Sequence, residues 1–394
     1  MPDIRPEDNS PSLTATYISR LPARRGRLRL AVKDVLDVIG TKTTAGSSLV
    51  YDLAEPVDAD AECLGHMRSA NVSIVGKTNL HELAFGFTGV NPHFGTPTNP
   101  LNSTTVPGGS SSGSAVAVAT GDVNIAIGTD SAGSVRMPAA CCGVVGLKLT
   151  NGCVPLTGVW PLAPSLDSLG VFGRDVEAAR VAAELLTGRT FEDRTADPWI
   201  GRIRGLVAHP SVDNAVDAAL ADSHIKCKNV PICRWDDALR AVRTLISYEA
   251  WNSNRSLLEH WEGVRYGIGD DVVRRLQHGK MVDEYQLAEV SAVRVALDKE
   301  VRCIFRGVDV LALPTLPIPP PHYAVAGAVD LARFTAPVNL LGLPALTLPV
   351  PSGTDIGSLQ LVADHGQEAL LLAVARRIVR SVGSPWTGSL RENE

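Results

Sequence analysis

The sequence predicts a layered α/β protein, because segments with strand character and segments with helix character alternate along most of its 394 residues. Apolar runs such as residues 308–313 and 345–350 are typical of buried strands. Some helical segments have recognisable ends: Asp175 precedes residues 176–186 and Gly188 follows them. Such alternation is the pattern of a sheet covered by helices.

The other elements are expected on the same grounds. Strands are expected where apolar and β-branched residues run together or alternate with polar ones, at residues 28–32, 72–75, 123–127, 308–313, 345–350 and 359–363. Helices are expected where good helix formers recur with helical spacing, at residues 57–70, 80–85, 114–120, 176–186, 239–251, 285–305 and 367–382.

Four parts of the chain differ in character. Residues 1–26 carry acids, prolines and arginines and are expected to form an N-terminal arm. Residues 27–188 and 306–394 contain the expected strands and should form the core. Residues 189–305 contain four of the six tryptophans and most of the long amphipathic helices, so we expect a helical segment or cap that belongs to the same domain.

The composition excludes several classes of function. A net charge of −5 leaves no basic patch for nucleic acid or for an anionic membrane. Residues 1–26 contain no apolar signal-peptide core, and no stretch approaches the roughly 18 apolar residues of a membrane-spanning helix. The seven cysteines have no regular spacing and are interpreted as reduced thiols. We therefore expect a cytoplasmic protein that acts on a small molecule, without nucleic-acid or membrane partners.

Two serine-rich clusters and one lysine are the candidate catalytic elements. The first cluster is P-G-G-S-S-S-G-S at residues 107–114, the second is G-T-D-S-A-G-S-V-R at residues 128–136, and the lysine is Lys33. The first cluster alone could be a flexible linker, or a phosphate loop without the G-K-[ST] ending. It also matches the G-x-S-x-G elbow of α/β-hydrolase esterases, with Ser111 as nucleophile and His365 as base, although the proline-containing run before it cannot form the central strand that an elbow requires.

The second cluster follows an apolar strand directly and consists of small residues. Successive backbone N–H groups in such a turn can form a nest for negative charge. Ser131, Ala132 and Gly133 are therefore candidate oxyanion-binding residues, and Ser134 at the end of the nest is the candidate nucleophile. Lys33 is the candidate base, because its apolar neighbours predict burial, which lowers the pKa of a lysine and makes the neutral amine available.

The two clusters and their surroundings resemble the amidase signature family. The matching stretches are A-V-K-D-V-L-D-V-I-G-T-K-T-T-A-G-S, G-K-T-N-L-H-E-L-A-F-G, P-G-G-S-S-S-G-S-A-V-A-V-A-T-G, G-T-D-S-A-G-S-V-R-M-P-A-A-C-C-G-V-V-G-L-K and P-L-A-P-S-L-D-S-L-G. The resemblance is nearly continuous over residues 28–177 and resumes over residues 308–379, where it includes F-T-A-P-V-N-L-L-G-L-P-A-L.

This resemblance implies a fold and a mechanism. The fold is a central twisted mixed β-sheet between helical layers, and the catalytic group is a Ser–cis-Ser–Lys triad of Lys33, Ser110 and Ser134, with a cis peptide between Gly109 and Ser110. Lys33 would accept a proton through Ser110, Ser134 would form an acyl-enzyme, and no metal or organic cofactor would be needed. Ala132 stands where the family usually has glycine, so its backbone φ must be negative.

The expected function is hydrolysis of a linear C–N amide bond through a serine acyl-enzyme. The alternative is a glutamine-hydrolysing amidotransferase subunit that works with a partner protein. The resemblance implies an acidic residue in such subunits where Ala332 stands here, which favours a stand-alone hydrolase. A homodimer is the default oligomeric state. Asp130 and Arg136 are interpreted as a buried ion pair that holds the nucleophile turn.

Overall fold

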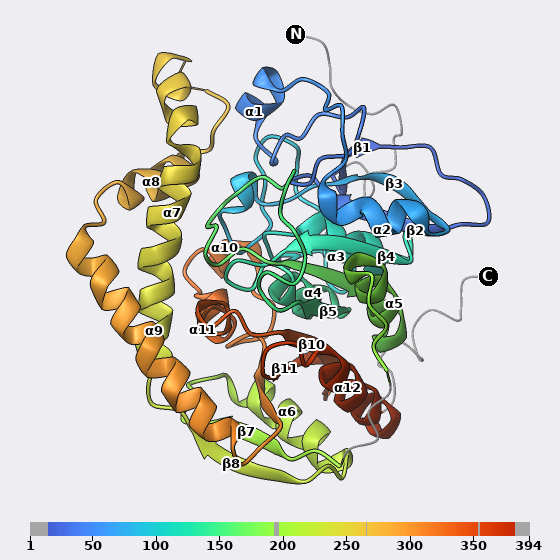
Figure 1. Cartoon of the computed structure of the whole chain (residues 1–394), viewed down its shortest axis with the longest axis vertical. Helices are drawn as coiled ribbons and strands as arrows, with labels where there is room; N and C mark the ends of the chain where they lie inside the picture. The colour runs from blue at the N-terminus through green and yellow to red at the C-terminus, as the bar shows by residue number, and fades with distance from the viewer. Residues whose placement is uncertain (1–14, 193–196, 265, 354, 383–394) are drawn as a thin grey trace.

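The computed structural model describes residues 15–192, 197–264, 266–353 and 355–382. Its centre is one eleven-stranded sheet with the strand order β1-β3-β2-β4-β6-β5-β10-β11-β9-β7-β8 (Figure 1). In chain order the strands are β1 (Tyr17–Arg20), β2 (Leu28–Lys33), β3 (Val72–Thr78), β4 (Ile125–Thr129), β5 (Val145–Lys148), β6 (Leu169–Gly173), β7 (Ile200–Arg204), β8 (Cys227–Pro231), β9 (Val310–Pro314), β10 (Ala345–Ser352) and β11 (Asp355–Val362).

The strand directions confirm the expected mixed α/β fold. Strand β2 runs parallel to β3 and β4, and β7 runs parallel to β8 and β9. The remaining neighbours, such as β4 with β6 and β10 with β11, are antiparallel. Because parallel strands have their carboxyl ends at the same edge of a sheet, the last residues of β2 and β4, Lys33 and Thr129, come out close together.

Helices cover both faces of the sheet. They are α1 (Ser48–Leu53), α2 (Gly65–Ser69), α3 (Ser112–Ala119), α4 (Arg136–Cys142), α5 (Val176–Thr187), α6 (Pro210–Asp222), α7 (Trp235–Val264), α8 (Asp270–Gly279), α9 (Glu284–Phe305), α10 (Tyr323–Ala326), α11 (Ala336–Leu340) and α12 (Glu368–Val382). Successive residues of a strand point to opposite faces. Ala126 and Phe172 accordingly pack in one apolar cluster with α3 and α4, whereas Ile127 and Val171 belong to the larger core that includes α5.

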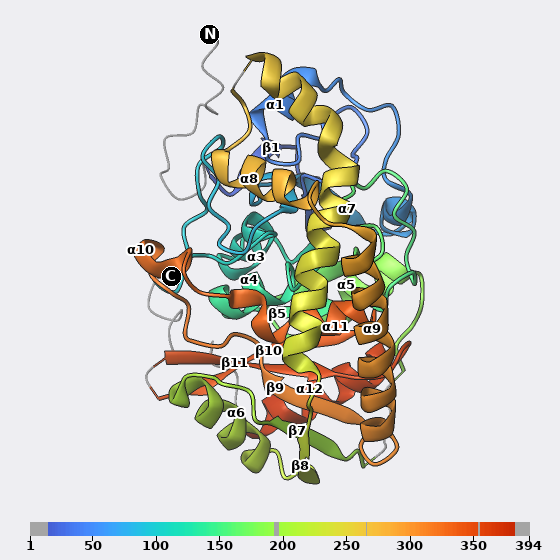
Figure 2. The same cartoon turned by 90° about the vertical axis from the view of Figure 1, so that its left-hand side faces the viewer.

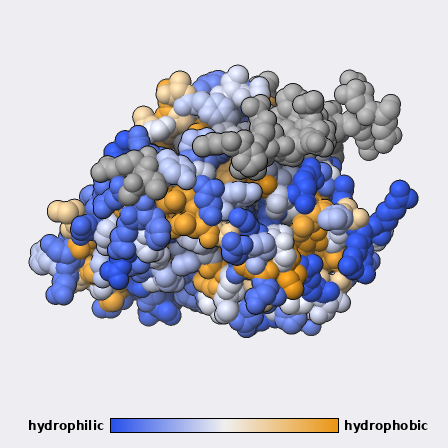
Figure 3. All heavy atoms as spheres, turned by 90° about the horizontal axis from the view of Figure 1, so that it is seen from above, coloured by the Kyte–Doolittle hydropathy of each residue, from blue (hydrophilic) through white to orange (hydrophobic). Residues whose placement is uncertain are grey.

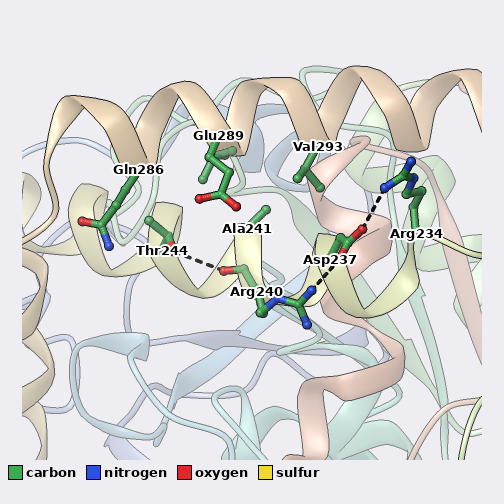
Figure 4. A pocket seen from close by; sticks show the side chains of 9 residues that line it. Arg234, Asp237, Arg240, Ala241, Thr244, Gln286, Glu289 and Val293 are labelled. Atoms are coloured by element: carbon green, nitrogen blue, oxygen red, sulfur yellow. Dashed lines mark hydrogen bonds and ion pairs between the residues drawn. The ribbon is translucent and has the colours of Figure 1, made fainter.

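Helices α7, α8 and α9 form an outer layer along one side of the molecule (Figures 1 and 2). Helix α7 contacts α8, α9 and α11. A groove of about 350 Å³ lies between α7 and α9, where Arg234 and Arg240 both pair with Asp237 (Figure 4). The expected helical part, residues 189–305, also supplies strands β7 and β8 to the sheet and helix α6 between them. The sequence does not predict these two strands, because at five residues each they are too short to stand out from the helical pattern around them.

The two ends of the chain are only partly described. Residues 1–14 of the expected N-terminal arm and residues 383–394 lie outside the described residues. The described part of the arm includes β1, which is an edge strand paired antiparallel with β3. The arm is thus joined to the sheet through this strand.

The surface is mixed in polarity, and the cysteines are unpaired. At the end of the molecule seen in Figure 3, hydrophobic side chains form small patches among hydrophilic ones. No helix within the described ranges has the length and apolar character needed to span a membrane. All seven cysteines are free thiols, as their irregular spacing predicted.

Helix ends follow local sequence signals in one case and long-range contacts in another. The caps of α5 are confirmed: the Asp175 side chain accepts a backbone N–H of the first turn, and Gly188 ends the helix with φ of 66°. The helix expected at residues 57–70 forms only in its C-terminal half, because the N–H of Ala61, which a helix would bond to the carbonyl of Val57, donates instead to the carbonyl of Asp37 at 2.9 Å. A backbone partner distant from the helix therefore removes its first turns.

The helix expected at residues 80–85 is also wrong, and a short 3₁₀ turn replaces it. Leu83 and Ala84 have φ of 51° and 55°, in the left-handed region that residues other than glycine rarely adopt. The N–H of His81 donates to the carbonyl of Ser110 at 2.9 Å, which directs this segment toward the first serine cluster. Contacts with residues far along the chain override the local helical pattern.

A buried ion pair between Asp130 and Arg136 connects distant parts of the fold. Both side chains are fully buried, and Arg136 Nη2 lies 2.8 Å from Asp130 Oδ1. Arg136 also donates to Gln360 of β11 at 2.7 Å, to the Thr335 carbonyl at 3.0 Å and to Asn339 of α11. Burial alone would raise the pKa of Asp130, but the Arg136 guanidinium outweighs it and holds that pKa well below its ordinary range. The predicted buried ion pair is confirmed.

We expect Arg136→Met to lower the free energy of unfolding by about 3–5 kcal/mol, because it leaves Asp130 buried without a compensating charge. Urea unfolding followed by circular dichroism measures this change. The control is Arg302→Met, which removes an exposed ion pair with Asp298 on α9 and should cost less than about 1 kcal/mol. Equal losses in the two variants would contradict the role given to Arg136.

Candidate active site

Lys33 ends β2 inside the protein and is fully buried. Its Nζ lies 2.7 Å from Oγ of Ser110 and 2.8 Å from Oγ1 of Thr129. Thr129 ends the neighbouring parallel strand, and Ser110 lies in the loop that leads into α3. Because β2 is hydrogen-bonded to strands on both sides, its last side chain is held at the carboxyl edge of the sheet.

Burial changes the protonation of Lys33. Removal of the ammonium from water lowers the pKa of Lys33 to about 7, although the nearby carboxylates of Asp167 and Asp130 act in the opposite direction. A lysine with this pKa is substantially neutral at pH 7, and its free electron pair can accept a proton. The neighbouring Ser110 hydroxyl is within hydrogen-bonding distance for such a transfer.

The loop that carries Ser110 is closely packed against residues 86–89. The peptide between Gly109 and Ser110 is cis. The Gly109 N–H donates to the Phe87 carbonyl at 2.7 Å. A Cβ atom on Gly109 would lie 2.6 Å from the backbone nitrogen of Gly89, so a side chain cannot be accommodated there without movement of the backbone. The position of Ser110 therefore depends on this neighbouring segment.

Other serines of the first cluster connect α3 to the sheet. Ser111 Oγ is fully buried and donates to the Thr129 carbonyl at 3.3 Å. Ser114 Oγ donates to the Ile127 carbonyl at 3.0 Å and lies 2.7 Å from Oγ1 of Thr78. These hydroxyls bond to backbone carbonyls of β4 and have a structural role.

Ser134 lies in the turn that follows β4 and is buried. Its carbonyl accepts the Ser111 N–H at 3.2 Å, which links the two serine clusters. Within the described ranges, its hydroxyl forms no hydrogen bond to Ser110 or to another residue. The structure therefore brings Lys33 and Ser110 into direct contact. Ser134 is joined to the residue after Ser110 by the hydrogen bond between its carbonyl and the Ser111 N–H.

The three candidate oxyanion residues differ in what their amides contact. Gly133 has φ of 124°, and its N–H donates to Asp130 Oδ1 at 2.8 Å. The amides of Ser131, Ala132 and Ser134 have no hydrogen-bond partner in the part of the chain that the structure describes. Ala132 does not have a positive φ, which meets the requirement of its methyl group. In this geometry the Gly133 amide, one of the predicted oxyanion donors, is occupied by Asp130 and holds the turn, whereas the other three amides have no protein partner there.

Side chains from distant segments contact the same turn. Ser131 Oγ donates to Asp167 at 2.5 Å, and Thr335 Oγ1 donates to the Ala132 carbonyl at 2.6 Å. Thr335 and Thr129 are contacts of the site that the sequence does not predict. Thr129 has a local signal, since it ends a buried strand beside Asp130, but Thr335 is about two hundred residues away and has none.

The esterase-type alternative pairs Ser111 with His365. His365 is exposed, and its ring nitrogens contact Asp364 and, at 2.9 Å, the Leu341 carbonyl. No hydrogen bond joins His365 to Ser111 among the described residues. Across these residues, no group of three or more His, Cys, Asp or Glu side chains is arranged to hold a metal ion.

Comparison with known proteins gives one consistent family. The model of the amidase family matches residues 28–372. A glutamyl-tRNA(Gln) amidotransferase subunit from Natronomonas pharaonis is 33% identical over 396 residues, which cover 87% of this chain and 93% of the relative. The corresponding protein from Halobacterium salinarum is 33% identical over 404 residues, which cover 88% and 93%.

Solved structures agree with this assignment. An amidase crystal structure matches with a TM-score of 0.81 and 30% identity, over 90% of this chain and 85% of that one. The corresponding amidotransferase subunit from Thermotoga maritima matches with a TM-score of 0.80 and 26% identity, over 95% and 89%. The family match covers both serine clusters and both halves of the sheet, and we conclude that this chain belongs to the amidase family.

Proposed function

We propose that this protein is a stand-alone amidohydrolase that cleaves a linear C–N amide bond through an acyl-enzyme on Ser134. The observation that carries the proposal is the 2.7 Å contact between Ser110 and Lys33, a buried lysine whose pKa is lowered to about 7. Family membership supports C–N bond chemistry in general. The three residues have distinct roles: Lys33 is the base, Ser110 the proton relay and Ser134 the nucleophile.

The first half of the proposed reaction forms the acyl-enzyme. Ser134 Oγ attacks the amide carbon while its proton passes to Ser110 and the Ser110 proton passes to neutral Lys33. The carbonyl oxygen becomes negatively charged, and the amides of the turn after β4 donate to it. The C–N bond then breaks, and the leaving amine takes the proton back through the same relay.

The second half restores the enzyme. A water molecule attacks the Ser134 ester and passes its proton to the relay, the ester bond breaks, and Ser134 recovers its proton as the carboxylic acid leaves. Donors already oriented toward the oxyanion need no rearrangement during the reaction, which is the main electrostatic advantage of the turn.

A glutamine-hydrolysing subunit is the second candidate, because both curated relatives described above are amidotransferase subunits by name. At the position where we expect an acidic residue in such subunits, this chain has the buried Ala332. The Ala332 methyl group offers no negative charge to bind the ammonium of glutamine. This difference favours a substrate without an α-ammonium group.

We expect a fluorophosphonate or sulfonyl fluoride probe to modify Ser134 in the native protein, because the relay makes this hydroxyl nucleophilic. Mass spectrometry of the digested adduct identifies the modified residue. Heat-denatured protein and the Ser134→Ala variant should remain unlabelled. A label on Ser111, or none at all, would refute the assignment.

We expect Lys33→Ala and Lys33→Arg to lower kcat by at least about 100-fold, since alanine has no base and arginine cannot become neutral. In the native enzyme kcat/KM should rise with pH through about 7, because the ammonium form cannot accept a proton. The matched control is Lys226→Ala, which removes an exposed lysine paired with Asp197. Near-normal kcat in Lys33→Arg, or a rate that falls with rising pH in this range, would reject Lys33 as the base.

We expect the purified chain to hydrolyse uncharged aliphatic or aryl amides without a partner, with kcat/KM about tenfold or more above that for glutamine. The reason is that the Ala332 position offers no carboxylate to the glutamine ammonium. Ammonia or amine release across a panel of amides measures the preference. If glutamine is hydrolysed only after a second protein is added, the amidotransferase alternative is correct.

A further inference from the structure

The segment of residues 81–89 lies between the proposed relay residue and helix α8. On one side it contacts the Ser110 loop through the hydrogen bonds of His81 and Phe87 already described. On the other side its groups contact α8 or the residue before it. This segment also contains the left-handed residues Leu83 and Ala84, a conformation that persists only where the surroundings enforce it.

Gly269, which precedes α8, and Asp271 and Arg275 within the helix make these contacts. The N–H of Gly269 donates to Glu82 Oε2 at 2.8 Å. Asp271 Oδ2 lies 3.5 Å from Nε2 of His81. Arg275 donates to the carbonyl of Phe85 and lies 3.6 Å from Asp271. We call Gly269, Asp271 and Arg275, with the groups they touch, the α8 contact.

The His81 ring is closely confined on its other side. A Cβ atom on Gly86 would lie 2.1 Å from Nε2 of His81, so the imidazole rests directly on the backbone of this segment. His81 is buried, and its own N–H donates to the Ser110 carbonyl. If loss of Asp271 displaces the ring, His81 can transmit that movement directly to Ser110, because its own N–H is bonded to the Ser110 carbonyl.

We propose that Asp271 is a positioning residue for the amidase reaction, which acts through His81 and the segment of residues 81–89 to fix Ser110 beside Lys33. This inference rests on the proposed function. Asp271 does not touch Lys33, Ser110 or Ser134 in the described structure, so it is not a catalytic residue. The helical layer then contributes to the chemical step as well as to the covering of the fold.

The test compares Asp271→Asn and Asp271→Glu with the matched control Asp298→Asn. Asp298 pairs with Arg302 four residues along α9, as Asp271 pairs with Arg275 along α8, and it is similarly exposed. We expect Asp271→Asn to lower kcat about tenfold with KM within about twofold, because a small misplacement of a reacting group is costly. Asp271→Glu should recover part of the loss, and Asp298→Asn should behave as wild type.

Hydrogen exchange gives a readout that does not depend on activity. Asp271→Asn should speed amide exchange in residues 81–89 and 107–113, and Asp298→Asn should not. Unchanged exchange or unchanged kcat in Asp271→Asn would overturn the proposal. Should that variant fail to fold, Arg275→Gln, which removes the bond to the Phe85 carbonyl, must produce the same exchange change for the proposal to stand.

A double-mutant cycle tests the route through His81. If Asp271 acts through His81, the loss of kcat in Asp271→Asn/His81→Gln should be no larger than in His81→Gln alone. Losses that multiply would overturn the route. If wild-type protein is not labelled at Ser134, the proposed function fails, and the exchange experiment still decides whether the α8 contact holds the Ser110 loop.

Discussion

The buried ion pair of Asp130 and Arg136 is the interaction on which the rest of the site depends. Asp130 directly follows β4, and its carboxylate accepts the N–H of Gly133 as well as the guanidinium. Arg136 carries the same network to Asn339 and Gln360, which come from the C-terminal part of the chain. The turn that holds Ser134 is therefore held by groups from both the N-terminal and the C-terminal parts of the chain.

The same ion pair also influences Lys33, the proposed base. An unpaired carboxylate near Lys33 would stabilise the ammonium and raise its pKa. Asp130 is instead neutralised by Arg136, and burial raises the pKa of Asp167, which weakens the opposing effect of that carboxyl as well. Burial of Lys33 can consequently dominate, and its pKa falls to about 7. A turn that needs a buried carboxylate for its shape can thus coexist with a nearby lysine whose pKa is lowered.

The parts of the site that the sequence could predict are those with local signals. Lys33 ends an alternating strand, and the caps of α5 are formed by adjacent residues, so local sequence alone predicts them. Ser110 could not be distinguished from its neighbours by local pattern and required the family resemblance. Thr335, which contacts the turn from far along the chain, had no signal. The helix expected at residues 80–85 was wrong because partners distant in sequence hold a left-handed backbone there.

The outer helices contact several of the loops that surround the proposed triad. Helix α7 accepts the N–H of Ser165 through Glu249 at 2.9 Å and the indole N–H of Trp160 through Asn254 at 2.9 Å. Its Trp235 indole donates to the Arg333 carbonyl at 3.0 Å, two residues before Thr335. Helix α8 contacts the segment beside Ser110. Because these contacts reach the loops and not the triad itself, changes in the helices can reshape the walls of the site while the sheet keeps Lys33 in place. The helical segment, where the family resemblance is weakest, is therefore the part of the chain best placed to set which amide the enzyme accepts.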